Sequence, residues 1–288
     1  MIEVEKLSND NMQKFHALLS EAKAINPFIK DFISYYDGKS FIYRYLIRKS
    51  VYLIKFDNIF MGYIWIEAPA AESIKIHDIY IIKKYLRYFT GKLMLILKTK
   101  IVTLESFENN YTQELFKALD MTKIRITYLM KYNKKPVEKL KLPENVSFRL
   151  YKNKKDAAIR CDLQNKIFYN NSRVPLSVDD ICYDEKQDYY LDDFSVFILV
   201  KGIEIGYGQI ISSRNMYQIV NFGILKGYRG LGLGKLLLNR LLYLADESCI
   251  NDNLYIRVDT NNKAAYNLYS SSNFEKVGNF STWMWTRD

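Results

Sequence analysis

The chain has 288 residues, of which 49 % are hydrophobic, and a formal net charge of +10. This length is more than one hydrophobic core usually holds, so we expect two domains of about 140 residues each. No apolar run approaches the roughly 20 residues of a membrane span, and the first residues lack the basic start and apolar stretch of a signal peptide. A membrane partner is therefore not expected.

The few cysteines and histidines exclude several kinds of site. Cys161, Cys182 and Cys249 are odd in number and widely spaced, which is typical of reduced thiols in the cytoplasm and shows no metal-binding pattern. With only His16 and His77 present, a histidine-based triad or a zinc site is not expected. We predict a cytoplasmic protein without a bound metal.

Positive charge is concentrated in the first half of the chain. Residues 1–143 contain 24 Lys and Arg against 15 Asp and Glu, whereas residues 144–288 contain 18 against 17. Nucleic acid is one class of partner that suits a basic half. The lysines are scattered rather than clustered with aromatic residues, so we predict a solvated basic surface and no nucleic-acid partner.

The pattern of the first half alternates between strands and helices. Strands are predicted at 2–7, 51–56, 59–67, 74–82, 101–107 and 123–132, with 51–56 and 59–67 forming a hairpin around Asp57-Asn58. Helices are predicted from a cap at Asn9 or Asp10 to about residue 24, then irregularly to 48, and at 91–99 and 111–119.

A charged stretch with two prolines, residues 133–145, is predicted to be a linker, after which the same order of elements restarts. Strands are predicted at 146–151, 195–201, 205–212, 217–225 and 254–259 and from 274 to 285, with helices at 155–169, 234–247 and 263–271. We therefore predict two domains, 1–132 and 146–288, joined by the linker 133–145.

Local similarity supports an internal duplication. Met61-Gly62-Tyr63 matches Ile205-Gly206-Tyr207, and residues 83–93 can be aligned with residues 226–236. In that alignment Leu86 faces Arg229, Arg87 faces Gly230 and Phe89 faces Gly232, and a Phe side chain would occupy the space that a pyrophosphate needs. We expect the first copy to keep the fold without binding the cofactor.

The stretch from Ile224 to Arg240 contains a glycine loop between a strand and an amphipathic helix. Glycines let the backbone approach a ligand closely, and amides at a helix start favour an anion such as a pyrophosphate. The spacing fits neither a P-loop nor a dinucleotide fingerprint, because the required glycines fall on Arg229 and Lys235. A glycine-rich turn without a ligand is the simpler alternative, but one glycine would suffice for it.

Arg229-x-x-Gly232-x-Gly234 resembles the coenzyme A pyrophosphate loop of the GCN5-related N-acetyltransferases, the GNAT family, whose pattern is Gln/Arg-x-x-Gly-x-Gly/Ala. A later stretch, from Asn262 through Leu268-Tyr269 to Asn273-Phe274, resembles the family's Asn-x-x-Ala-x-x-Leu-Tyr-x-x-x-Gly-Phe. Asn273 replaces the usual glycine, and asparagine tolerates the left-handed backbone expected there. Tandem members of the family share the layout with a degenerate first copy.

The resemblance implies an α/β (α+β) fold class, with two tandem acyl-CoA N-acyltransferase folds, each a mixed, mostly antiparallel sheet flanked by helices. It further implies direct transfer of an acetyl group from acetyl-CoA to a primary amine of a small molecule or peptide. Carried over to this sequence, the cofactor-binding residues are Ile224, Leu225, Arg229, Gly230, Leu231, Gly232, Leu233, Gly234, Lys235, Asn262 and Tyr269. Backbone amides around Ile224 and Leu225 would polarise the thioester carbonyl.

Tyr269 is implied as the general acid that protonates the leaving thiolate, with a core tyrosine bonded to the backbone as the alternative. No carboxylate lies on the strand 217–224, so a general base is not identified, although Asn221 is a candidate for positioning a water. An acidic cluster either attracts a cationic amine or is a solvated loop; it comprises Asp179, Asp180, Asp184, Glu185, Asp188, Asp192 and Asp193.

Two other functions stay open. One is a non-catalytic acyl-CoA-binding module, in which the lack of an obvious base reflects lost chemistry. The other is an aminoacyl-tRNA-dependent transferase, since some of these enzymes also pair two copies of this fold. The intact glycine loop argues against the latter, whereas salt-sensitive tRNA binding would argue for it.

Overall fold

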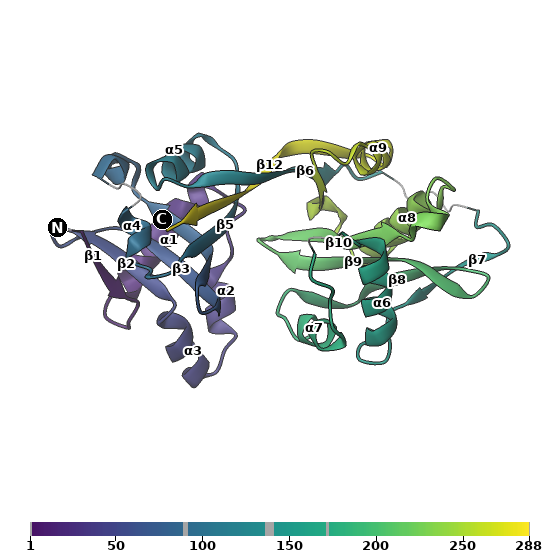
Figure 1. Ribbon diagram of the computed structural model, residues 1–288, viewed down its shortest axis with the longest axis horizontal. Coiled ribbons are helices and arrows are strands. Elements are labelled where there is room, and N and C mark those ends of the chain that lie inside the picture. The colour runs from purple at the N-terminus through teal and green to yellow at the C-terminus, as the bar shows by residue number, and fades with distance from the viewer. Residues whose placement is uncertain (1, 89–91, 136–140, 171–172, 288) are drawn as a thin grey trace. The chain divides into compact units, whose positions relative to one another are not determined.

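The computed structural model describes residues 2–88, 92–135, 141–170 and 173–287 (Figure 1). Contacts divide the chain into two compact units, Met1–Thr127 with Gly278–Asp288 and Tyr128–Val277. Two strands contribute residues to both units, β6 (Thr122–Tyr132) and β12 (Phe274–Thr286). Separating the chain at the predicted linker would therefore divide residues of the same unit. Within that linker, residues 136–140 lie outside the described part.

The first unit has strands in the order β1-β2-β3-β4-β5-β12, in which β4 and β5 are parallel and the other neighbours are antiparallel. Its other elements are β1 (Ile2–Lys6), α1 (Met12–Ile25), α2 (Phe32–Asp37), α3 (Phe41–Arg48), β2 (Val51–Phe56), β3 (Ile59–Ala70), β4 (Ser73–Ile81), the 3₁₀ helix η1 (Lys83–Tyr88), α4 (Lys92–Leu95), β5 (Ile101–Phe107) and α5 (Asn110–Ala118).

The second unit has the same order of strands when it is followed from its other edge, β7-β8-β9-β10-β11-β6. Its elements are β7 (Val146–Leu150), α6 (Ala157–Ile167), α7 (Val178–Asp184), β8 (Tyr190–Val200), β9 (Ile203–Ser213), β10 (Met216–Ile224), the 3₁₀ helix η2 (Lys226–Tyr228), α8 (Leu233–Glu247), the 3₁₀ helix η3 (Asn251–Asn253), β11 (Leu254–Asp259) and α9 (Lys263–Ser271). The predicted fold class, two copies of a mixed and mostly antiparallel sheet with helices, is confirmed.

In the second unit, helices cover both faces of the sheet. A Cβ built on Gly208 would meet Leu241 of α8, whereas one built on Gly223 would meet Ile167 of α6. Because successive residues of a strand point to opposite faces, α6 and α8 lie on different sides of β9 and β10. The α8 side is apolar, with Leu237, Leu238 and Leu241 fully buried.

A few predicted boundaries were wrong. The helix expected over 91–99 reaches only from Lys92 to Leu95 among the described residues, because the chain turns at Lys98, whose φ is 51°. Helix α1 begins after Asn11 rather than after Asn9 or Asp10. The strands expected at 195–201 and 205–212 leave residues 202–204 between them, whereas β8 and β9 are joined by a two-residue turn at Lys201 and Gly202, whose φ values are 51° and 78°.

No helix within the described ranges is long and apolar enough to cross a lipid bilayer.

Candidate functional site

The two central parallel strands of the second unit separate toward their carboxyl ends. Strands β10 and β11 pair from Tyr217 to Ile219 only, and the pairing of β10 with β9 shifts register between Val220 and Gly223. The Leu225 amide donates to the Ile205 carbonyl at 2.9 Å. Alternation in an antiparallel ladder then turns the backbone N–H and C=O of Ile224 away from β9, toward the side where β11 has departed.

The amides of Ile224 and Leu225, which the sequence analysis treated together, differ in their hydrogen bonding. The Leu225 N–H is used by the sheet, so it is not free to polarise a carbonyl. The Ile224 N–H has no hydrogen-bond partner among the described residues that pack around the end of β10. Of the two predicted amides, only that of Ile224 is placed to bind an acyl oxygen.

The glycine loop leads directly into helix α8. Gly230 and Gly232 have φ values of 79° and 76°, and a Cβ on either would meet no atom within 4 Å. Glycine is the residue that adopts this left-handed backbone without strain. The glycines are thus required by the backbone conformation, and the space beside them is open.

Helix α8 begins at Leu233 without a side-chain cap and without an acidic residue in its first turn. The N–H groups of Leu231, Gly232, Leu233 and Gly234 find no acceptor in the described part of the second unit. Lys235, in the first turn, is exposed. Unpaired amides at the positive end of a helix dipole, with a lysine beside them, form a site suited to a phosphate or pyrophosphate.

The Arg229 side chain bonds to two backbone carbonyls. Its Nε donates to the carbonyl of Ile224 at 2.9 Å, and its Nη2 donates to the carbonyl of Ile167 at 3.0 Å. These two bonds tie the loop to the end of β10 and to the end of α6. Arg229 therefore fixes the shape of the loop.

Tyr269 lies on α9 and packs against the bulged end of β10. Its ring centroid is 5.9 Å from that of Phe222, and the preceding Leu268 lies 3.4 Å from a Cβ built on Gly234. The side chain is 5 % exposed, and burial raises its pKa above the ordinary value. Its hydroxyl has no partner in the described residues and is not sealed from solvent, unlike that of a core tyrosine bonded to the backbone.

Two asparagines of the predicted site are placed as well. Asn262 caps α9 by accepting from the amide of Ala265 at 3.1 Å, so its side chain has a structural role. Asn221 lies in the bulge of β10 with φ of 52°, and its Nδ2 donates to Gln209 Oε1 at 3.3 Å. Asn273, at the end of α9, has the predicted left-handed backbone, with φ of 65°.

Most of the acidic cluster is used by the fold. Asp180 forms a capping box with Ser177 at the start of α7, and Asp184 pairs with a buried arginine. Glu185 accepts a hydrogen bond from a tyrosine hydroxyl, and Asp192 accepts one from an asparagine amide. These four carboxylates are therefore engaged in the structure, whereas Asp179, Asp188 and Asp193 are exposed.

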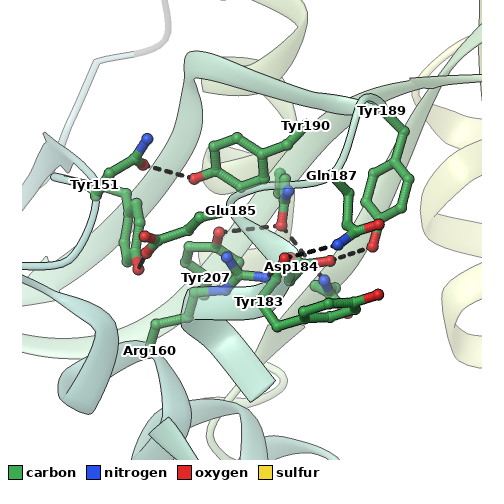
Figure 2. A network of polar contacts seen from close by, with 12 residues as sticks. Tyr151, Arg160, Tyr183, Asp184, Glu185, Gln187, Tyr189, Tyr190 and Tyr207 are labelled. Atoms are coloured by element: carbon green, nitrogen blue, oxygen red, sulfur yellow. Dashed lines mark hydrogen bonds and ion pairs between the residues drawn. The ribbon is translucent and has the colours of Figure 1, made fainter. Parts of the chain in front are cut away.

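The buried arginine is Arg160 on α6, which is 1 % exposed and which sequence reasoning missed because a charged helix residue is expected at the surface. Figure 2 shows it beside Asp184 and three aromatic rings. The rings of Tyr207, Tyr151 and Tyr190 lie 5.2, 5.5 and 6.0 Å from its guanidinium carbon. Its Nε and Nη1 have no hydrogen-bond partner among the residues that the structure describes, so the aromatic faces take that place.

The first unit has the same separation of its parallel strands, but the backbone groups at that point are hydrogen-bonded to a side chain. Strands β4 and β5 pair only from Ser73 to Ile76, and the Ile82 amide donates to Met61 just as Leu225 donates to Ile205. The hydroxyl of Tyr111 accepts from the Ile81 amide at 2.9 Å and donates to the Ile81 carbonyl at 2.8 Å.

In the alignment of the two copies, Ile81 stands where Ile224 stands in the second. A protein hydroxyl thus fills the position at which the second unit has an unpaired amide. Leu86, the counterpart of Arg229, is buried and apolar, and Phe89 lies outside the described residues.

Comparison with known proteins agrees with this architecture. Residues 164–274 match the model of the Acetyltransferase (GNAT) family. The second unit therefore carries a GNAT domain, and acyl transfer from an acyl-CoA is the reaction of that family. No curated protein matches the sequence.

Solved structures extend the likeness to the whole chain. A GCN5-related N-acetyltransferase from Sphaerobacter thermophilus has a TM-score of 0.70 at 12 % identity, covering 99 % of this chain and 95 % of its own. A tandem GNAT protein from the clavulanic acid biosynthesis pathway, solved without AcCoA, has 0.68 at 10 %, covering 99 % and 98 %. A GNAT acetyltransferase from Colwellia psychrerythraea has 0.60 at 12 %, covering all of both chains. The chain has the fold of tandem GNAT proteins.

Proposed function

We propose that the chain is an N-acetyltransferase that moves an acetyl group from acetyl-CoA to a primary amine, using the second unit alone. The observation that carries this proposal is the run of unpaired amides from Leu231 to Gly234, held by two left-handed glycines in open space. These amides and Lys235 would hold the cofactor's pyrophosphate, and the Ile224 N–H would donate a hydrogen bond to the thioester carbonyl oxygen.

Transfer then needs one bond made and one broken. The neutral amine nitrogen attacks the thioester carbonyl carbon, the C–S bond breaks, and the sulfur leaves as a thiolate. Tyr269 gives its proton to that sulfur and is reprotonated by solvent, while the new amide nitrogen releases one proton to water. Burial raises the pKa of Tyr269, so its hydroxyl is protonated at neutral pH, and its position against the end of β10 is what supports this role.

The first unit is proposed to bind no cofactor. The Tyr111 hydroxyl satisfies both backbone groups of Ile81, so a thioester oxygen would have to displace it. In the second unit, the helix that corresponds to α5 is α9, and it places Tyr269 against strand β10 instead. One cofactor per chain is the expected stoichiometry.

Two measurements test the proposal. Calorimetry with acetyl-CoA should give one site per chain, and two equivalent sites would contradict the assignment of the first unit. Release of free thiol from acetyl-CoA should then depend on an added amine from a panel of glucosamine, spermidine, lysine and an N-terminal alanine peptide. Binding without amine-dependent thiol release would favour the acyl-CoA-binding module, and no binding at all would remove the transferase assignment.

A further inference from the structure

The bulge of β10 carries the amide side chain of Asn221, which has no role in the reaction proposed above. Asn221 sits where the β10–β9 register shifts, and its φ of 52° is one that asparagine tolerates better than most residues. Bulges commonly redirect a side chain next to a site. The Asn221 side chain points along the sheet to β9, where its Nδ2 donates to Gln209.

Gln209 is held from both sides. It is fully buried on β9, and its Oε1 accepts from Asn221 Nδ2 at 3.3 Å and from the Tyr207 hydroxyl at 3.2 Å. The Tyr207 hydroxyl and the Asn221 amide thus both donate to the same end of the Gln209 side chain. The Gln209 Nε2 is buried and has no partner in the described ranges of the chain, so this orientation leaves that group unsatisfied.

The consequence for Asn221 is a defined orientation. Because its Nδ2 is used by Gln209, its Oδ1 is left as the acceptor, and that oxygen has no partner among the described residues of the second unit. Asn221 is half-buried and lies three residues before Ile224, whose amide would hold the acyl oxygen. An amine that attacks beside Ile224 brings N–H groups that need an acceptor.

We infer that Gln209 is a positioning residue, which locks the Asn221 amide so that Oδ1 accepts an N–H of the acceptor amine. The inference rests on the proposed function. It assigns Asn221 to the acceptor rather than to a water, and it gives Gln209 no contact with either substrate.

The test is a double-mutant cycle with Gln209→Leu, Asn221→Gly and the double variant. Glycine keeps the left-handed backbone at position 221. The assay uses acetyl-CoA with the panel amine that the wild type acetylates fastest. Each single change should lower kcat/KM for the amine about three- to tenfold, the range expected for one neutral hydrogen bond. The double variant should be no slower than Asn221→Gly, because Gln209 acts through Asn221.

Gln164→Leu is the matched control. Gln164 is another buried glutamine whose Nε2 has no partner, and it lies on α6. Its loss should change thermal stability as Gln209→Leu does but leave KM for the amine unchanged. The calorimetric Kd for acetyl-CoA should stay the same in all variants.

Additive losses in the cycle, or an equal rise in the amine KM for Gln164→Leu, would overturn the positioning role while leaving the transferase proposal intact. Absence of amine-dependent turnover in the wild type would instead overturn the proposed function, and the role of Gln209 with it.

Discussion

Two glycines of the second unit allow the phosphate-binding role of the loop to be separated from its effect on folding. Gly232 ends the loop with φ of 76°, and Gly202 turns the β8–β9 hairpin with φ of 78°. A Cβ on either residue would meet nothing within 4 Å. The cost of alanine at each position is therefore backbone strain alone, about 1–2 kcal/mol for a left-handed residue.

Gly232→Ala and Gly202→Ala should thus lower the melting temperature of the second unit by similar amounts, roughly 2–8 °C. Only Gly232→Ala changes the amides at the start of α8. A charge-assisted hydrogen bond contributes about 1.5–3 kcal/mol, so the loss of one predicts an acetyl-CoA Kd weaker by roughly 10- to 150-fold. Calorimetry and thermal unfolding of the two purified variants measure both quantities. Equal Kd values for the two variants would refute the pyrophosphate site, whatever their stability.

Four further outcomes are expected. Tyr269→Phe should cut turnover by about 10²–10⁴ with little change in acetyl-CoA Kd, while Tyr266→Phe on the same helix should not; unchanged turnover in the first removes the acid role. Arg160→Met should destabilise the second unit by about 1.5–3 kcal/mol in urea unfolding, because Asp184 loses its charged partner and keeps the hydrogen bond from the Tyr189 hydroxyl, and a loss below about 1 kcal/mol would show that the pair is dispensable. Tyr111→Phe should cost the first unit about 1–3 kcal/mol by leaving buried backbone groups unpaired, and calorimetry should still find one cofactor per chain; a second site would mean that the hydroxyl alone blocks the first unit. Glu108→Gln should reduce the loss of stability that the first unit undergoes as the pH falls, measured as the free energy of unfolding between about pH 3 and about pH 7. An unchanged pH dependence would show that Glu108 does not contribute to it.

The sign of the last prediction follows from the surroundings of Glu108. Burial raises the pKa of this carboxyl, but hydrogen bonds from Lys123, Ser281 and Asn279 outweigh burial and hold the pKa below its ordinary value of 4.5. A folded-state pKa below the unfolded one means that the ionised carboxylate stabilises the fold above about pH 4.5. This stabilisation is lost as the pH falls through the folded-state pKa. A glutamine at this position does not ionise, so it makes no such pH-dependent contribution.

The parts that could be predicted from sequence are those set by local backbone chemistry. Alternation and turn residues located nearly every strand, and the glycine spacing located the loop, because left-handed positions leave a direct trace in the residue type. The cap at Asn262 and the left-handed Asn273 followed for the same reason. The succession of strands and helices along the second copy followed from the internal duplication.

The parts that could not be predicted depend on which distant group a side chain meets. Nothing near Tyr111 in the sequence indicates that its hydroxyl reaches the backbone of Ile81, 30 positions earlier. Arg229 matches a cofactor motif, yet its bonds go to two carbonyls, one of them 62 positions away. Arg160 carries a charge that normally marks a surface residue, and only the surrounding rings and carboxylate make its burial tolerable.

The division of β12 has a consequence for the order in which the protein can be completed. Residues from Gly278 onward pair with β5 and carry Trp283 and Trp285 into the core of the first unit. A ribosome releases these residues only after every element of the second unit has been made. The first unit therefore cannot complete its sheet during translation, because one side of β5 stays unpaired until β12, the last strand, has been synthesised.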